Sequence, residues 1–469
     1  MGLKKQADFH GKKVHVIGAA RSGLAAAEVL VSLGSVVTMH DEKDSAELED
    51  ALRQARKIGV RVMTGARAYE GIESADLVIP SPGVPGTCPA LVTACDCGIP
   101  IMSEVELGYR VSQAPIIAVT GTNGKTTTSA LVGEILRRDG GRVYVAGNIA
   151  AGDIKLPLSK AALQASPSDV IVAEISSFQL EWISSFRPRI AALLNVSADH
   201  LDRHSDLTAY ARTKGRIFEC QEEEDYAVLN ADDPLVMELA SGIRSQVWQF
   251  SRKGEVELGT FVRGTEVWFA GPTGTELACD TAAMKLRGAH NLENVLAAAA
   301  VALAFGAKGE CVQQSIDAFE PLEHRLEPVA EIGGVEFLNN SMCTNVLAGV
   351  RSLEAIGRPA VVIAGGKGKG SDYRPLGEAF VRGAKHVVLM GEDARLIDEA
   401  ARAAGFDRIS HVVSMEEAVE VAWRHAQPGD AVVLSPGCKS FDMFRDFEHR
   451  GQVFKTAVAA LAARTGGQS

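Results

Sequence analysis

Short apolar runs alternate with stretches of helical spacing along most of the chain. Residues 13–17 and 36–39 are two such runs, and the segment from Leu24 to about Leu33 between them has helical periodicity. The pattern returns after Pro115 and again in the last third, with runs at 360–364, 386–390, 411–413 and 431–435. Buried strands that alternate with helices are typical of parallel sheets covered by helices.

The alternation predicts an α/β protein of three domains, which a length of 469 residues accommodates at roughly 150 residues each. We predict an N-terminal Rossmann-like domain over 1–113 and a central domain with a parallel sheet over 114–321. A C-terminal Rossmann-like α/β domain would cover 322–469. Within the central domain, the region 247–287 is rich in Gly, Thr and Val and predicts short antiparallel strands.

One junction carries the clearest chemical signal. The apolar run 117–120 is followed by Gly121, Thr122, Asn123, Gly124, Lys125, Thr126 and Thr127, after which helical spacing begins. Between a strand and a helix, loop amides and the helix dipole converge on one point, where the lysine adds charge and the Thr126 hydroxyl can reach Mg²⁺. Val119 stands in place of the first glycine of the pattern G-x-x-x-x-G-K-[ST]. The flanking strand and helix nevertheless predict a site for a nucleoside triphosphate, so we expect the central parallel sheet to be of the P-loop ATPase type.

Polar side chains stand at the ends of further strands of the central domain. Glu174 follows the apolar run 169–173, and His200 follows the run 189–195. Parallel strands end at one edge of a sheet, so both residues would emerge beside the phosphate loop, where a carboxylate suits a metal ion. The alternatives are a helix-capping acid and a structural histidine. Asn291 and Asn294, one turn apart at the start of an Ala-rich helix, could contact a purine or cap the helix.

Two turns in the N-terminal domain mark a second candidate ligand site. In the stretch Gly18 to Gly23, Ala20 replaces the middle glycine of G-x-G-x-x-G, the one that lets backbone approach a pyrophosphate. A dinucleotide is therefore disfavoured and a mononucleotide-type ligand is preferred, with packing glycines as the alternative. The turn 81–83, Ser-Pro-Gly, follows another strand at the sheet edge where ligands bind.

The third domain has two polar turns after apolar strands. Residues 364–371 form a second loop rich in glycine and lysine, and 435–442 is a polar turn. The first loop lacks the Gly-Lys-Ser/Thr ending of a phosphate loop. An anionic substrate therefore fits this domain better than a second nucleoside triphosphate.

Composition and charge limit the kinds of molecule that this protein is expected to bind. The formal net charge of −11 disfavours a nucleic-acid or anionic-membrane surface. Eight cysteines are scattered without zinc-site spacing, and the longest apolar run, 295–305, is too short to span a bilayer. The first residues lack the apolar region of a secretory signal. We expect a cytoplasmic enzyme with reduced thiols and small-molecule substrates, without a nucleic-acid partner or membrane insertion.

The stretches 121–127, 174–181, 435–440 and 447–451 carry a resemblance to a known family. Together they resemble the Mur ligases, the ATP-dependent enzymes that add amino acids in peptidoglycan synthesis, and the similarity extends over essentially the whole chain. The last three stretches are most similar to the branch that adds D-glutamate to UDP-N-acetylmuramoyl-L-alanine. The resemblance implies an acyl-phosphate intermediate and a requirement for ATP and two Mg²⁺ ions. The three domains would bind the UDP-linked substrate, ATP and the amino acid in chain order, and we expect a monomer.

The resemblance also implies roles for individual residues. ATP would be bound by Gly121, Thr122, Asn123, Gly124, Lys125, Thr126, Thr127, Asn291, Asn294 and Arg325. The UDP-linked substrate would be bound by Gly18, Ala19, Ala20, Arg21, Ser22, Asp41, Ser81, Pro82, Gly83 and Asn148. Glutamate would be bound by Thr344, Lys369, Ser440 and Phe447, and metal by Thr126, Glu174, His200 and Lys214. Lys125, His200 and Lys214 would be the catalytic residues.

The family match puts Lys214 beside the second metal ion, which raises a chemical difficulty. An ammonium group cannot ligate Mg²⁺, because hard cations take oxygen ligands. We therefore expect Lys214 to be carbamylated, which gives its side chain two carboxylate oxygens. An ordinary lysine on a helix surface is the alternative.

One stretch departs from the family pattern Asn-Asp-Ser-Lys-Ala-Thr-Asn. Residues 339–345 read Asn-Asn-Ser-Met-Cys-Thr-Asn. The acid expected at the ATP ribose is therefore Asn340, and the lysine expected near the reacting groups is Met342. Thr344 and Asn345 are retained, so the departure bears more on nucleotide affinity than on glutamate binding.

Other classes stay open as alternatives. A folylpolyglutamate-type ligase would add L-glutamate with a similar ATP core, but it would lack a UDP-binding domain like 1–113. A diamino-acid-adding Mur ligase would show Asp-Asn-Pro-Arg, which the sequence does not contain. An NAD-linked oxidoreductase would depend on Gly18 to Asp41 alone. A non-catalytic nucleotide-binding scaffold would lack the metal ligands.

Overall fold

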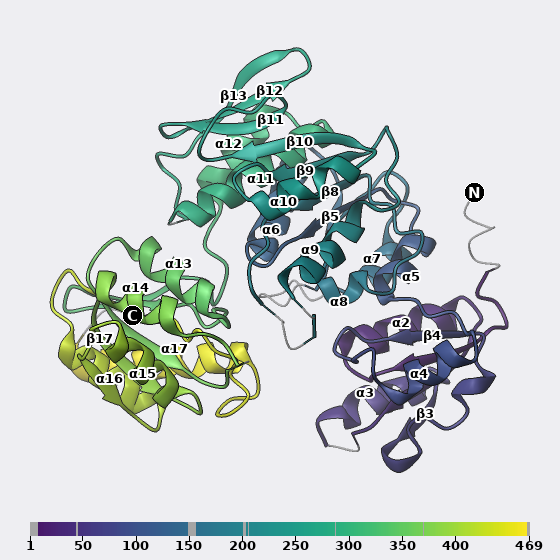
Figure 1. The fold of residues 1–469 in the computed structure, drawn as a ribbon, viewed down its shortest axis with the longest axis horizontal. Coiled ribbons are helices and arrows are strands. Elements are labelled where there is room, and N and C mark those ends of the chain that lie inside the picture. The colour runs from purple at the N-terminus through teal and green to yellow at the C-terminus, as the bar shows by residue number, and fades with distance from the viewer. Residues whose placement is uncertain are drawn as a thin grey trace. The chain divides into compact units, whose positions relative to one another are not determined.

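The computed structural model describes residues 8–43, 46–148, 156–199, 203–204, 206–286, 288–368 and 370–466. These residues form three sheets accompanied by helices, so the predicted three-domain α/β class is confirmed (Figure 1). The chain divides into two compact units, of which the first is Met1–Ala282 with Glu293–Asp317 and the second is Ala283–Leu292 with Ala318–Ser469. The first unit contains two of the sheets and the second unit contains one.

The N-terminal sheet is parallel and has the strand order β3-β2-β1-β4. It consists of β1 (Lys13–Ile17), β2 (Val36–Asp41), β3 (Arg61–Thr64) and β4 (Leu77–Pro80), with α2 (Arg21–Ser32), α3 (Ala46–Lys57) and α4 (Pro89–Asp96). Because β1 lies between β2 and β4, the loops after these three strands open at the same edge. The start of α2 lies three residues before the predicted Leu24, because its first turn contains the polar Arg21 and Ser22, which apolar periodicity does not register.

The central sheet has nine strands in the order β13-β12-β11-β10-β9-β8-β5-β7-β6. They are β5 (Ile116–Thr120), β6 (Val143–Gly147), β7 (Val170–Glu174), β8 (Ile190–Leu193), β9 (Tyr226–Asn230), β10 (Gln246–Ser251), β11 (Gly259–Arg263), β12 (Glu266–Gly271) and β13 (Gly274–Asp280). The helices between Glu104 and Ala318 are α5 (Glu104–Val111), α6 (Lys125–Arg138), α7 (Leu158–Gln164), α8 (Ser177–Leu180), α9 (Leu207–Gly215), α10 (Pro234–Glu238), α11 (Ala289–Phe305) and α12 (Gly309–Ala318).

The prediction of antiparallel strands over 247–287 is correct for β11 to β13 but wrong for β10. β11, β12 and β13 pair antiparallel, whereas β10 pairs parallel with both β9 and β11. The helix α10 between β9 and β10 allows the chain to cross back, and such a crossover produces a parallel neighbour. A tight turn would have produced an antiparallel one.

The C-terminal sheet has six strands in the order β14-β15-β19-β16-β17-β18. They are β14 (Glu327–Ile332), β15 (Val335–Asn339), β16 (Ala360–Gly365), β17 (Ala384–Met390), β18 (Ile409–His411) and β19 (Ala431–Leu434), with α13 (Val346–Ile356), α14 (Arg374–Gly383), α15 (Ala394–Ala403), α16 (Met415–His425) and α17 (Phe447–Thr465). β18 ends where the strand 411–413 was predicted to begin. The reason is that Val413 is 84% exposed and its apolar side chain is not part of the core.

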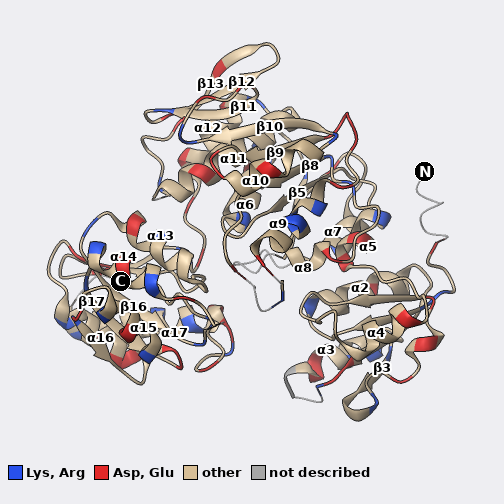
Figure 2. Ribbon diagram, viewed as in Figure 1, with Lys and Arg blue, Asp and Glu red and all other residues tan. Residues whose placement is uncertain are grey.

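Lys and Arg are interspersed with Asp and Glu along the elements of both units (Figure 2). All eight cysteines are free, which agrees with the expectation of reduced thiols. Within the described ranges, no helix is both long enough and apolar enough to cross a membrane.

A buried histidine pair should make the N-terminal sheet sensitive to acid. His15 on β1 and His40 on β2 stack with ring centroids 4.8 Å apart, and His40 Nε2 lies 3.0 Å from His15 Nδ1. Burial, and then the neighbouring His40, lower the pKa of His15 from 6.5 to about 4. Between these values the unfolded chain binds a proton that the fold excludes, so the free energy of unfolding falls as the pH drops.

We expect the free energy of unfolding to decrease by about 1–3 kcal/mol per excluded proton between pH 6.5 and 4. Chemical denaturation at a series of pH values measures it, and the variant His15→Gln should show a shallower pH dependence. An identical pH dependence in this variant would contradict the assignment to the pair.

Candidate active site

The predicted phosphate loop lies between β5 and α6. Gly124 has a φ of +87°, and a Cβ there would lie 2.2 Å from Asn294 Oδ1, so both conformation and space require glycine. Lys125 is the first residue of α6, and its Nζ donates to the backbone oxygens of Gly121 and Thr122, each at 2.9 Å. The loop therefore lies at the N-terminus of α6, where amides and helix dipole favour an anion.

Asn195, which sequence reasoning did not single out, holds this loop in place. It follows β8, accepts from the backbone N–H of Asn123 at 2.9 Å and donates from Nδ2 to the Asn123 oxygen at 3.1 Å. Its own backbone oxygen accepts from the Thr122 N–H at 3.0 Å. An asparagine after an apolar strand was the available signal, but sequence alone does not show which loop it reaches. These bonds fix the loop before any ligand binds.

Glu174 ends β7, which pairs with β5 so that Glu174 lies opposite Val119. Its Oε2 accepts from the Thr126 hydroxyl at 2.7 Å, and its Oε1 accepts from Asn148 Nδ2 at 3.3 Å. The structure thus brings Thr126, Asn148 and Glu174 together at the sheet edge. Hydroxyl and carboxylate oxygens are the ligands that Mg²⁺ prefers, so this donor set fits that ion.

Lys214 on α9 is 1% exposed, which rules out an ordinary surface lysine. Its Nζ donates to the Gly121 oxygen at 2.9 Å and lies 4.4 Å from the centroid of the Tyr210 ring. Burial, and then the charge of Lys125, lower the pKa of Lys214 well below its usual value, although Asp199 and Glu174 act in the opposite direction. The position therefore favours a neutral, nucleophilic amine. His200 lies outside the described residues.

A cavity of about 480 Å³ lies at the carboxyl edge of the N-terminal sheet. Four of the residues predicted to bind the UDP-linked substrate line it, namely Gly18, Ala20, Asp41 and Gly83. Tyr69 and Cys88, which sequence reasoning did not identify, also line it. Asp41 Oδ2 accepts from the backbone N–H of Ala19 at 2.9 Å, so the loop after β1 is tied to the end of β2.

The glycines of this loop have different roles. A Cβ at Gly23 would lie 1.9 Å from the Gly18 oxygen, so Gly23 is required for packing of α2 on the strand. Gly18 has a φ of +95°, and its oxygen accepts from Ser81 Oγ at 3.1 Å. Ala20 has an ordinary φ of −72° and precedes α2. The packing alternative therefore accounts for Gly23, whereas Gly18 and Ala20 line the cavity.

In the second unit, Asn291 and Arg325 line a cavity of about 420 Å³ together with Lys285 and Glu320. Asn294 belongs to the first unit, where its Oδ1 accepts from Thr128 Oγ1 at 3.4 Å and faces Gly124. Asn294 therefore contacts α6 and lies against the phosphate loop.

Two of the residues predicted for glutamate follow neighbouring strands of the C-terminal sheet. Thr344 follows β15 and Ser440 follows β19, while Phe447 begins α17. β15, β19 and β16 are parallel and adjacent, so the loops after them share one edge. Lys369, in the loop after β16, lies outside the described residues.

Arg450 joins these loops, a role that sequence reasoning did not assign. Its side chain is buried and donates to the Ser341 oxygen at 2.8 Å and to the Cys438 oxygen at 3.1 Å. Ser341 Oγ in turn donates to the Phe447 oxygen at 2.7 Å. Burial lowers the pKa of Arg450 to about 10, which leaves it cationic at neutral pH.

Asn340 and Met342, the two residues that differ from the family pattern, both contact the turn that carries Arg325. Asn340 Oδ1 accepts from the Leu326 N–H at 3.2 Å, and Arg325 Nη2 lies 3.0 Å from Met342 Sδ. Leu326 has a left-handed φ of +46°, so this hydrogen bond supports a conformation that leucine disfavours. An aspartate at position 340 could accept the same hydrogen bond.

We expect Asn340→Asp to lower the KM for ATP about 3- to 10-fold, because a carboxylate accepts a stronger hydrogen bond from a ribose hydroxyl. The KM for glutamate should stay nearly unchanged in steady-state assays. The control Asn340→Ala, which loses the bond to Leu326, should lower stability by about 1 kcal/mol. A higher KM for ATP in Asn340→Asp, or a main effect on glutamate, would show that the pocket is organised differently.

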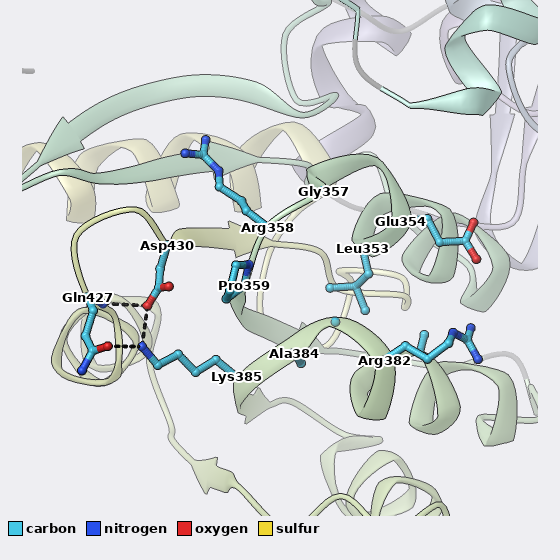
Figure 3. Close-up of a pocket in the computed structure, with 12 residues that line it drawn as sticks. Leu353, Glu354, Gly357, Arg358, Pro359, Arg382, Ala384, Lys385, Gln427 and Asp430 are labelled. Carbon is cyan, nitrogen blue, oxygen red and sulfur yellow. Dashed lines mark hydrogen bonds and ion pairs between the residues drawn. The ribbon is translucent and has the colours of Figure 1, made fainter.

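A larger cavity of about 970 Å³ lies at the opposite edge of the C-terminal sheet, where β16, β17 and β19 begin (Figure 3). Leu353, Pro359 and Ala384 line its middle, and Lys385 points away from Arg382 toward Asp430, to which it donates at 2.7 Å. Thr344, Ser440 and Phe447, the residues predicted for glutamate that the structure describes, do not line this cavity. This cavity and these predicted glutamate residues therefore lie at opposite edges of the C-terminal sheet.

Three family models match the chain in order. They describe a Mur ligase MurD-like N-terminal domain over residues 12–103, a Mur ligase middle domain over 119–302 and a Mur ligase glutamate ligase domain over 324–438. The chain belongs to the Mur ligase family.

Two relatives that match nearly the whole chain carry the same name. The UDP-N-acetylmuramoylalanine--D-glutamate ligase of Pelotomaculum thermopropionicum is 46% identical over 97% of this chain and 99% of its own length. The enzyme of the same name from Geobacillus kaustophilus is 41% identical over 98% of this chain and 100% of its own length. The structure of UDP-N-acetylmuramate-alanine ligase MurC from Thermotoga maritima is similar in fold, with a TM-score of 0.61 at 18% identity over 96% of this chain and 100% of that one.

Proposed function

We propose that this chain is an ATP-dependent ligase that joins D-glutamate to UDP-N-acetylmuramoyl-L-alanine in the synthesis of peptidoglycan precursors. The observation that carries the proposal is the arrangement around the phosphate loop, where Thr126, Glu174 and the buried Lys214 meet at one sheet edge. The relatives named for this reaction match nearly the whole chain, including the N-terminal domain. A folylpolyglutamate-type ligase is the weaker alternative, because it would not have that domain.

The first step would transfer the γ-phosphoryl group of ATP to the alanyl carboxylate, which gives an acyl phosphate. The amine of glutamate would then attack this carbonyl, and phosphate would leave. Both steps concentrate negative charge, and preorganised donors are the main means of stabilising it. Lys125 Nζ and the amides at the N-terminus of α6 would bind the transferring group, and Asn195 would hold the loop in that geometry.

Thr126 and Glu174 would hold one Mg²⁺, and His200 with Lys214 would serve a second. When bound, Mg²⁺ neutralises phosphate charge and polarises the phosphoryl oxygens. Lys214 would take part as a carbamate: its neutral amine adds to CO₂, a C–N bond forms, and one proton leaves to solvent. Burial of Lys214 lowers its pKa, which supports this proposal because the reaction requires the uncharged amine.

The amino-acid substrate would bind at the edge shared by β15, β19 and β16. Thr344, Lys369, Ser440 and Phe447 would hold glutamate, and Arg450 would keep the loops after β15 and β19 in register. The cavity at the end of the N-terminal sheet would take the UDP group through Gly18, Asp41 and Gly83. We further propose that the enzyme acts as a monomer in the cytoplasm, where its eight free thiols stay reduced.

The experiment is phosphate release from ATP in reactions with one component omitted at a time. Release should require UDP-N-acetylmuramoyl-L-alanine and glutamate together. Release with glutamate and a folate acceptor would favour the folylpolyglutamate alternative. Release with neither acceptor nor glutamate would contradict the proposal.

A further inference from the structure

We propose that a chain of side-chain contacts within the first unit couples the loop at Pro82 to the phosphate loop, so that the UDP-linked substrate and ATP affect each other's binding. We call this series of contacting side chains the Arg203 relay. It consists of Arg203, Phe178, His204, Tyr210 and Lys214. The inference rests on the proposed function, which assigns the Pro82 loop to the UDP-linked substrate.

Arg203 forms the end of the relay at the N-terminal sheet. Its Nη1 donates to the Pro82 oxygen at 3.2 Å, while Nε and Nη2 donate to the two carboxylate oxygens of Glu181 at 2.9 and 2.5 Å. A bidentate pair of this kind fixes the plane of the guanidinium. Since Glu181 neutralises its charge, Arg203 is poorly suited to bind an anionic ligand. We therefore assign it as a positioning residue.

The middle of the relay consists of aromatic contacts. The Arg203 guanidinium carbon lies 4.5 Å from the centroid of the Phe178 ring. Phe178 stacks on His204, with ring centroids 6.0 Å apart and an angle of 19° between the ring planes. The ring centroids of His204 and Tyr210 are 5.0 Å apart. His204 is also tied to α8, because its Nε2 lies 3.2 Å from Ser177 Oγ. Packed rings of this kind form a contiguous path of the type through which coupling between two sites is carried.

The relay ends at the phosphate loop. Lys214 Nζ lies over the Tyr210 ring and donates to the Gly121 oxygen, which also accepts from Lys125 Nζ. A ligand that orders the Pro82 loop therefore acts on the positions of both lysines. The effect is reciprocal, because coupling between two binding equilibria is the same in either direction.

The test is titration calorimetry of the full chain with UDP-N-acetylmuramoyl-L-alanine, in the presence and absence of a non-hydrolysable ATP analogue with Mg²⁺. In the wild type the analogue should change the Kd of the UDP-linked substrate by about 5-fold or more, within the usual range of coupled sites. The coupling factor is the ratio of the Kd values of the UDP-linked substrate without and with the analogue. In Arg203→Met and Phe178→Leu this coupling factor should fall to within about twofold of one. The Kd of the analogue measured alone should stay unchanged, because neither substitution alters a residue of the phosphate loop.

Two variants serve as matched controls. Arg187→Met removes another paired, half-buried arginine of the first unit, whose Nε lies 2.6 Å from Asp225, and it should lower stability but keep the coupling. Phe178→Tyr keeps the ring and should keep the coupling as well. A coupling factor in Arg203→Met and Phe178→Leu equal to that of the wild type, or a factor of one in the wild type, would overturn the relay alone. Failure of the wild type to bind the UDP-linked substrate would overturn the proposed function and the relay together.

Discussion

Replacement of Lys125 by alanine should lower kcat on the order of 100-fold or more. Lys125 Nζ already lies within the phosphate loop, bonded to the oxygens of Gly121 and Thr122, so it needs little reorganisation to meet a developing negative charge. Removal of one preorganised donor typically costs about 10²- to 10³-fold in rate. Loss of this cation should also raise the pKa of Lys214, because the charge of Lys125 contributes to its depression.

Single-turnover measurement of ADP formation separates the rate effect from weaker ATP binding. Lys125→Arg keeps the charge and should recover part of the rate, and the exposed Lys253→Ala should behave as the wild type. A folded Lys125→Ala variant with near-normal turnover would refute the role of this lysine.

The second large effect is expected for Lys214→Ala, which should be nearly inactive and regain part of its activity with short carboxylic acids in the buffer. The physical reason is that an added carboxylate can occupy the position of the lost carbamate oxygens. Lys125→Ala provides the matched control, because a carboxylate cannot replace a cation and should not restore that variant.

Carbamylation can also be observed without turnover. Incubation of the wild-type protein with ¹³C-labelled bicarbonate should give a carbamate signal in the NMR spectrum, and Lys214→Ala should lack it. An unmodified amine at Lys214 in a map of the Mg²⁺-bound enzyme, or full activity of Lys214→Ala, would exclude the carbamate.

Sequence motifs were sufficient to predict the positions of residues that stand in short contiguous stretches. The loop 121–127 and the carboxylate of Glu174 stand directly after apolar strands, and the parallel arrangement of β5 and β7 brings them together. The same logic predicted that the turn 81–83 lies at the carboxyl edge of the N-terminal sheet, and the parallel pairing of β1 with β4 agrees. Alternation of strand and helix specifies the edge at which a residue emerges, and this was sufficient for these positions.

Other features depend on contacts between distant segments, which no local pattern reveals. Asn195 reaches Asn123 across 72 positions, Arg450 reaches Ser341 across 109, and Arg203 reaches Pro82 across 121. The predicted direction of β10 and the predicted end of β18 were wrong for a related reason. Apolar residues indicate burial, but strand pairing depends on the connection and on the neighbouring strand. The burial of Lys214 could likewise not be read from its neighbours in the sequence.

The most direct test of the proposed function is the identity of the product. Wild-type enzyme supplied with ATP, Mg²⁺ and UDP-N-acetylmuramoyl-L-alanine should be compared with D-glutamate and with L-glutamate, with the amide product measured by mass spectrometry. We predict that kcat/KM for D-glutamate exceeds that for L-glutamate, and that one phosphate is released per amide formed. Preference for L-glutamate, or ATP hydrolysis without amide formation, would contradict it.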